Sequence, residues 1–386
     1  MNRDSSGSGH ALIRRTRLDG TWRTFVHPGT APRLNARGKP LQGQLVGRAV
    51  VPEDWTRPLH LPLVRAGCDA AGACCALYHH MPAAPEDRER IRGLLGEEPG
   101  FDDLFVEAFA GHPGTLNIAT IEGRCAFQQA DGLCRVQVLG GPGAKPTSCS
   151  SYPAVLVACG EEWHASLRPE CACLARHALE GRMLSEDPQS WADLRARFLR
   201  VWSVPEEVVI AGQRSLPRDD YVGWMRATIA RLSTSFHPLE ALEAAGQDLG
   251  LQVGPPEDAW LARVQENLER EQREGDIELH PASPLRASFA WALDVVRALR
   301  GGLDPEPRWS RGRDGDHARR AASLATMVLH GHGLLEWREL GPAFTDLWRF
   351  LWLARASHAL RGPEVDDGCL ESLTTWIFLW RLVDWE

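Results

Sequence analysis

Long apolar runs are absent from this chain of 386 residues. No segment approaches the roughly 18 consecutive apolar residues that a membrane-spanning helix needs. The first ten residues also contain no apolar segment of the kind that a secretion signal carries. We therefore expect a cytoplasmic protein that makes no use of a membrane. Cysteines stay reduced in that compartment, and a chain of this length does not need disulfides in order to fold.

An excess of positive charge is also missing. The chain has 43 Lys and Arg residues against 51 Asp and Glu residues, which gives a net charge of -8. This balance predicts no nucleic-acid partner, because such partners are attracted by basic surfaces. A local basic group near the N-terminus is interpreted as a solvated arm, and it comprises Arg14, Arg15, Arg17, Arg23, Arg33, Arg37 and Lys39.

Several motifs of known chemistry are missing as well. The sequence has no C-x2-C or C-x4-C pair of the kind that builds zinc fingers and ribbons. It also lacks the C-x3-C-x2-C and C-x2-C-x2-C-x3-C runs that hold iron–sulfur clusters. Neither an H-E-x-x-H motif nor a G-x-G loop between a strand and a helix occurs. Any site must therefore be assembled from distant segments.

Cysteine is the residue type that is concentrated, because nine of the ten cysteines lie between Cys68 and Cys173. Thiolates held close together select zinc, copper(I) or iron–sulfur clusters. The two neighbours Cys74 and Cys75 point to opposite sides of an extended chain, so a second metal or a core role for one of them stays open. The predicted ligands are Cys68, Cys74, Cys75, Cys125, Cys134, Cys149, Cys171 and Cys173.

Other residues of ligand type receive a different interpretation. Cys159 follows an apolar run and, like Cys369, is expected in the core. We expect His330 and His332 to act as cations at the end of an apolar helix, where positive charge is favourable. Solvated or capping roles are preferred over a mixed metal site for the remaining histidines near the cysteines, which are His79, His80, His164 and His177.

Four cysteine-containing elements follow one another in a specific order. They are Cys68-Asp-Ala-Ala71-Gly72-Ala-Cys74-Cys75, the pair Gly123-Arg-Cys125-Ala-Phe127 and Gly132-Leu-Cys134-Arg-Val136, then Lys145-Pro146-Thr-Ser-Cys149-Ser-Ser-Tyr152-Pro153, and Ser166-Leu-Arg-Pro-Glu-Cys171-Ala-Cys173-Leu-Ala-Arg176. Together they resemble the zinc- or iron-chelating cysteine-cluster family of the YkgJ type, which includes the flagellin lysine-N-methylases. The resemblance covers about residues 65 to 180. The chain departs from the family pattern at Ala71, where a cysteine is expected, and at Lys145, Ser150 and Ala172. Cys159 or Cys173 could substitute for the thiol that is missing at Ala71.

The resemblance implies a bound metal centre, either zinc or an iron–sulfur cluster, including the 4Fe–4S form. In the methylase branch it further implies transfer of methyl groups from S-adenosylmethionine to lysine side chains of a protein substrate. Two alternatives stay open. One is a non-enzymatic, metal-stabilised module that binds a protein partner, and the other is a thiol redox sensor.

The expected fold is α+β and mainly α, in three parts. Residues 1–60 form a small β-containing segment with strands near 21–26 and 45–51, and residues 61–182 form a loop-rich cysteine-cluster domain with a helix from Pro85 that ends before Gly96. Residues 186–386 form an all-α domain, because apolar residues recur there at helical spacing. The predicted helices include a stripe from Trp191 to Val201 and another from Tyr221 to Leu232, then segments near 238–249, 257–273, 284–300, 314–331, 343–360 and 370–380.

Overall fold

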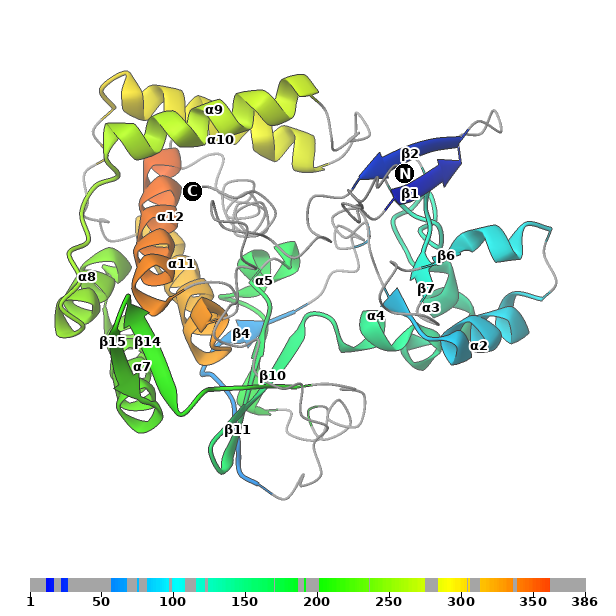
Figure 1. Cartoon of the computed structure of the whole chain (residues 1–386), viewed down its shortest axis with the longest axis horizontal. Helices are drawn as coiled ribbons and strands as arrows, with labels where there is room; N and C mark the ends of the chain where they lie inside the picture. The colour runs from blue at the N-terminus through cyan, green and yellow to red at the C-terminus, as the bar shows by residue number, and fades with distance from the viewer. Residues whose placement is uncertain are drawn as a thin grey trace, which may run out of the picture. The chain divides into compact units, whose positions relative to one another are not determined.

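The computed structural model describes residues 12–16, 22–26, 57–67, 75, 82–96, 99–107, 116–121, 124–169, 171–186, 191, 201–235, 237–274, 284–303, 305, 313–335 and 339–361. Helices predominate and the sheets are small, so the expected fold class, α+β and mainly α, is confirmed (Figure 1). The chain forms two compact units. The first contains residues 1–41, 70–150 and 274–286, and the second contains residues 42–69, 151–273 and 287–386. The cysteine block, residues 61–182, is thus divided between them.

Among its described residues, the first unit contains three small sheets and short helices. Strands β1 (Leu12–Thr16) and β2 (Trp22–Val26) form an antiparallel pair, which includes the strand expected at 21–26; residues 45–51 lie outside the described part. The other elements are β5 (Pro82–Ala83), β6 (Phe105–Glu107), β7 (Leu116–Ile118), β8 (Thr120–Ile121), β9 (Arg124–Cys125), α2 (Pro85–Leu95), α3 (Arg135–Gly140), α4 (Thr147–Ser151), η1 (Phe101–Leu104) and η2 (Pro142–Ala144).

Helix α2 begins and ends where the sequence predicts. Pro85 occupies the first turn, where a missing N–H costs nothing, and Gly96 ends the helix with a φ of 78° that favours glycine. The Asp87 carboxylate accepts a hydrogen bond from the backbone N–H of Ala84 at 3.1 Å, which caps the first turn. The inner face of α2 contributes Ile91 to a core that also contains Phe101, Phe105, Ile118, Phe127 and Val136.

The second unit is built on a four-stranded sheet in the order β13-β10-β11-β3. Its strands are β13 (Trp202–Ser203), β10 (Ala154–Cys159), β11 (Glu162–Leu167) and β3 (Leu59–His60). The short elements β4 (Arg65–Ala66), α5 (Ala172–His177), β12 (Arg182–Met183) and η3 (Leu184–Glu186) lie between strands of this sheet along the chain. Strands β14 (Glu207–Ala211) and β15 (Arg214–Pro217) form a hairpin that the all-α expectation for residues 186–386 did not include.

The helices of the second unit lie close to their expected positions. They are α7 (Arg218–Thr234), α8 (Pro238–Asp248), α9 (Asp258–Glu274), α10 (Pro284–Arg300), α11 (Arg313–His330), η4 (Gly333–Leu335) and α12 (Leu340–Arg361). Residues 192–200 and 362–386, where two further helices are predicted, lie outside the described part. Helix α11 packs against both α7 and β11. None of the helices described is both long enough and apolar enough to cross a bilayer.

Candidate metal site

The hairpin of β10 and β11 places a thiol and an imidazole on one face of the sheet. Cys159 lies opposite Glu162 in this antiparallel pair, and Val157 lies opposite His164. Opposed residues point to the same side and residues two apart share a face, so Cys159, Glu162 and His164 lie on a common face. A two-residue turn separates the strands, and Gly160 begins it with a φ of 60°.

Helix α11 lies against β11, and the residues that follow it place His332 in the site. Ser166 on β11 donates a hydrogen bond to the backbone carbonyl of Met327 at 2.9 Å. Gly331 follows the helix, and a Cβ at this position would lie 3.1 Å from the Cβ of Ser166 and 3.0 Å from the Met327 carbonyl oxygen. The close approach therefore favours glycine, and the chain then places His332 in the left-handed region with a φ of 52°.

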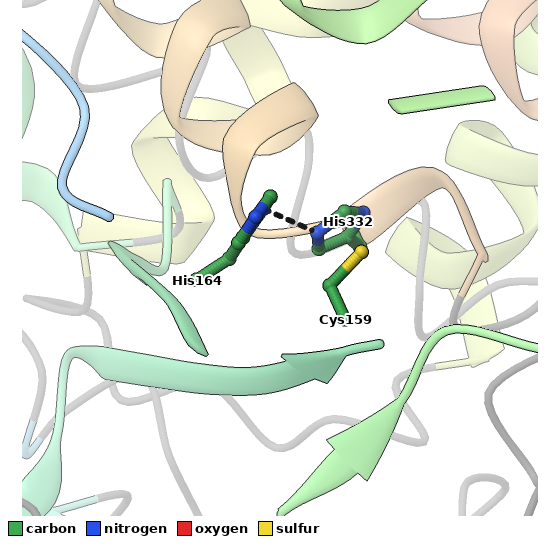
Figure 2. Close-up of side chains that lie close together, drawn as sticks. All are labelled: Cys159, His164 and His332. Atoms are coloured by element: carbon green, nitrogen blue, oxygen red, sulfur yellow. Dashed lines mark hydrogen bonds between the residues drawn. The ribbon is translucent and has the colours of Figure 1, made fainter. Parts of the chain in front are cut away.

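Cys159, His164 and His332 converge at this point, as Figure 2 shows. One ligand atom from each lies within 4.8 Å of the other two, and all three residues are buried. Nδ1 of His164 is 3.0 Å from Nε2 of His332. A thiol and two imidazoles at this separation can hold a metal ion.

Each imidazole also makes a second hydrogen bond through its other nitrogen. Nε2 of His164 donates to Oε2 of Glu162 at 3.3 Å, and Nδ1 of His332 lies 3.1 Å from the hydroxyl of Tyr221 on α7. A carboxylate only accepts hydrogen bonds, so the proton of neutral His164 resides on Nε2 and its Nδ1 carries the lone pair. Without a metal, His332 therefore donates to His164 through Nε2 and accepts from Tyr221 through Nδ1.

The electrostatic environment keeps this cluster neutral. Burial lowers the pKa of His164 to about 4, although the hydrogen bond to Glu162 opposes this effect. Burial and the neighbouring His164 and His330 lower the pKa of His332 well below its usual value. Burial raises the pKa of the Cys159 thiol to about 11, partly offset by Arg218. Neutral imidazole is the form that binds metals, whereas the thiol must lose its proton.

Glu162 is the charged group at the edge of the cluster. Burial alone would raise its pKa, but the hydrogen bond from His164 and the charges of His60 and Arg226 outweigh it, so the pKa is lowered. Arg226 donates to the same Oε2 atom at 2.7 Å. The Glu162 carboxylate is therefore ionised at neutral pH and orients His164.

The sequence-based expectations for three histidines were wrong. We interpreted His330 and His332 as cations at the end of a helix, but both are buried, and burial lowers the pKa of His330 to about 3. His164, expected to be solvated or capping, is 1% exposed. The expected burial of Cys159 is confirmed, but it lies in the cluster. The signals in the sequence were the C-x4-H spacing of Cys159 and His164 and the H-x-H spacing of His330 and His332. Only the packing of α11 on β11 brings these two pairs together.

Three of the predicted cysteine ligands lie together in the first unit. Cys125 ends β9, Cys134 precedes α3, and Cys149 lies in α4; all three pack on the same apolar core. Burial, then the nearby Cys125, raises the pKa of Cys149 to about 12, while a hydrogen bond with Ser148 opposes the rise. Among the residues that the structure describes, these three sulfur atoms are not a group within 4.8 Å.

The other predicted ligands are distributed between the two units. Cys75 belongs to the first unit and is half-buried, whereas Cys171 and Cys173 are buried at the start of α5 in the second unit. His177 ends α5, and its ring Cγ lies 2.8 Å from the position that a Cβ on Gly67 would occupy. Residues outside the described part include Cys68, Cys74, Cys369, His79 and His80. The ligand roles of the eight cysteines stay a prediction.

Comparison of the chain with family models, with curated proteins and with solved structures found no match.

Proposed function

We propose that this protein binds a divalent transition-metal ion, zinc in the first place, through Cys159, His164 and His332. The observation that carries the proposal is the orientation of the two imidazoles. The two rings face each other through nitrogens 3.0 Å apart, and the other nitrogen of each ring is hydrogen-bonded to Glu162 or Tyr221. Metal-bound histidines characteristically donate their second N–H to a carboxylate or another oxygen, which fixes the ring and strengthens the ligand.

The ligand types favour zinc over the hard cations. Thiolate and imidazole donors suit zinc, whereas calcium and magnesium take oxygen donors. Two imidazole nitrogens on a tetrahedral zinc ion are about 3.3 Å apart when each Zn–N distance is about 2.05 Å. The two facing nitrogens here are 3.0 Å apart, so a small opening of the pair would admit the ion.

Metal binding requires two proton movements in this cluster. The Cys159 thiol releases one proton to solvent and binds as the thiolate. His332 moves its proton from Nε2 to Nδ1, and Nδ1 then donates to the Tyr221 hydroxyl oxygen, which can accept as well as donate. Net uptake of one divalent ion at this site is thus accompanied by release of one proton.

The test is zinc content and affinity in matched variants. Protein purified without added metal is analysed for zinc, and zinc affinity is measured by competition with a chromophoric chelator. We expect Cys159→Ser and His332→Ala to lose one equivalent of zinc relative to the wild type, with His237→Ala, at the start of α8, as the control. Equal zinc content in all four proteins would overturn the proposal.

The resemblance to the cysteine-cluster family leads to a second proposal for the first unit, a thiolate centre that includes Cys125, Cys134 and Cys149. Their common position on one core supports it. Zinc and an iron–sulfur cluster are distinguished by anaerobic purification: brown protein that contains iron and absorbs near ~400 nm indicates a cluster. Colourless protein that contains only zinc would exclude the cluster.

Methyl transfer from S-adenosylmethionine to the lysines of a cytoplasmic protein substrate rests on the same resemblance alone. We expect that a co-expressed flagellin-like substrate gains methyl-lysine, and that Cys149→Ser removes this activity whereas Cys369→Ser does not. Wild-type protein that binds metal but methylates nothing would instead favour a metal-stabilised interaction module.

A further inference from the structure

His330 is a buried imidazole beside the proposed metal site. It ends α11, two residues before His332, and is 8% exposed. Its side chain hydrogen-bonds to the backbone of Ala165 on β11, and among the residues described no hydrogen-bond partner reaches its Nδ1. Nε2–H is therefore the donor to Ala165, and Nδ1 carries a lone pair in a buried setting. A buried acceptor without a hydrogen bond is energetically unfavourable, so Nδ1 of His330 is a candidate position for a bound ligand.

The ring of His330 also lies at a suitable distance from the imidazole of His164. Two imidazoles on one tetrahedral ion have their ring centres about 5 Å apart, because each centre lies about 3 Å from the ion. The ring centres of His164 and His332 are 4.9 Å apart, and those of His164 and His330 are 5.2 Å apart. Both pairs make the same interplanar angle of 28°.

We infer that Nδ1 of His330 is the fourth ligand, which closes a site of one cysteine and three histidines around the metal ion of the proposed function. All three imidazoles then follow one rule: the inner nitrogen binds the ion, and the outer N–H donates to Glu162, Tyr221 or Ala165. Nδ1 of His330 is outside the group within 4.8 Å, so the turn after α11 must close slightly on binding.

His60 is the competing candidate, and its position is less suitable. Its ring centre is 5.4 Å from that of His164, but the rings make an angle of 60°. Its Nε2 lies 3.3 Å from Oε1 of Glu162, and 40% of its side chain is exposed. His60 therefore lies beside His164 on β3, at a partly exposed position next to the carboxylate that holds His164. A site closed by His330 has no position for substrate or water, which makes the ion structural.

Cadmium NMR of the full-length protein tests this inference, because the chemical shift reports the number of sulfur ligands and separates this site from thiolate-rich centres. The resonance of the site is identified by its loss in Cys159→Ser and His332→Ala. An azide response of this resonance would mean an open fourth position on the ion. We therefore expect azide to leave the resonance unchanged in the wild type and in His60→Ala. In His330→Ala the resonance should shift and respond to azide, and cadmium affinity should fall at least tenfold. His330→Gln keeps an amide N–H that can donate to Ala165, and it should show the same shift, azide response and loss of affinity. It replaces the alanine variant in this test if that variant does not fold.

Three results would overturn the assignment of His330 while leaving the metal site intact. One is a wild-type resonance that responds to azide, which means an open fourth position. Another is a His330→Gln variant with wild-type affinity and chemical shift. The third is an azide response that appears in His60→Ala instead. If the wild type gives no resonance that depends on Cys159 and His332, the proposed function itself fails.

Discussion

At the scale of single residues, Glu162 decides how His164 faces the thiol. Its carboxylate accepts the Nε2 proton of His164, and Arg226 donates to the same oxygen. The adjacent Glu161 is chemically identical, but 91% of its side chain is exposed. The difference arises from the strand register, which pairs Glu162 with Cys159 and leaves Glu161 in the turn. These neighbours thus form a matched pair for mutation.

We expect Glu162→Gln to weaken zinc binding by about 10- to 100-fold, as replacement of such outer partners does in metal sites. The neutral amide removes the charge that stabilises the donating imidazole. Glu161→Gln should bind zinc as the wild type does. Chelator competition measures both, and equal affinity of the two variants would show that Glu162 does not act on the ligand.

At the scale of elements, a buried carboxylate connects two helices of the first unit. Asp87 in α2 is 2% exposed and accepts hydrogen bonds from the backbone N–H of Thr147 at 3.2 Å and from the Thr147 hydroxyl at 3.3 Å. Arg90 donates to it at 2.6 Å. Thr147 begins α4, which carries Cys149, so Asp87 positions this thiol relative to the apolar core.

Replacing Asp87 should therefore destabilise the protein. Asp87→Ala leaves the backbone donors of Ala84 and Thr147 buried without their acceptor, and we expect the free energy of unfolding to fall by about 1–3 kcal/mol. Glu86→Ala changes an exposed carboxylate in the same turn and should cost less than about 0.5 kcal/mol. Urea unfolding followed by circular dichroism gives both values; a wild-type midpoint for Asp87→Ala would contradict the assigned role.

At the scale of the whole molecule, buried neutral histidines make stability depend on pH. His317 on α11 stacks against His358 on α12, with ring centres 4.7 Å apart. Burial, and the charges of His358, Arg355 and Arg320, lower the pKa of His317 to about 3. In the unfolded chain this group takes up a proton below about pH 6.5, whereas in the folded protein it stays neutral. Stability is therefore present above pH 6.5 and is lost as the pH falls toward 3.

Between pH 7 and pH 5, His317 alone should lower the free energy of unfolding by about 2 kcal/mol. His317→Gln cannot take up a proton, so its decrease over this interval should be smaller than that of the wild type by this amount. Urea titrations of both proteins at the two pH values measure the difference. If the free energy of unfolding decreases equally in the wild type and in His317→Gln, His317 is charged, or accessible, in the folded protein.

Bound metal should also stabilise the second unit, because its ligands come from the β10–β11 hairpin and the turn after α11. An ion present at about 1,000 times its dissociation constant contributes about 4 kcal/mol when it binds the folded state alone. We expect a chelator to lower the melting temperature of the wild type, and to lower that of Cys159→Ser by less. Cys369→Ser serves as the thiol control, and an equal chelator effect in all three would locate the stabilising metal elsewhere.

Local signals in the sequence determined much of this protein. Proline, acids and glycine set the limits of α2, and helical periodicity located α7 to α12, because these signals act within a few residues of one another. Periodicity did not reveal the hairpin of β14 and β15, whose five- and four-residue strands are too short to give a clear alternation.

The candidate site was decided by tertiary structure. Cys159 and His332 are far apart in the sequence, and nothing near His332 distinguishes a ligand from a helix-end cation. Close packing of Gly331 on Ser166 brings α11 onto β11 and buries the histidine beside the thiol. Burial then lowers the pKa of the imidazole and keeps it neutral. The sequence by itself determined that soft metal ligands are abundant; only packing decided that Cys159, outside the predicted set, meets two histidines.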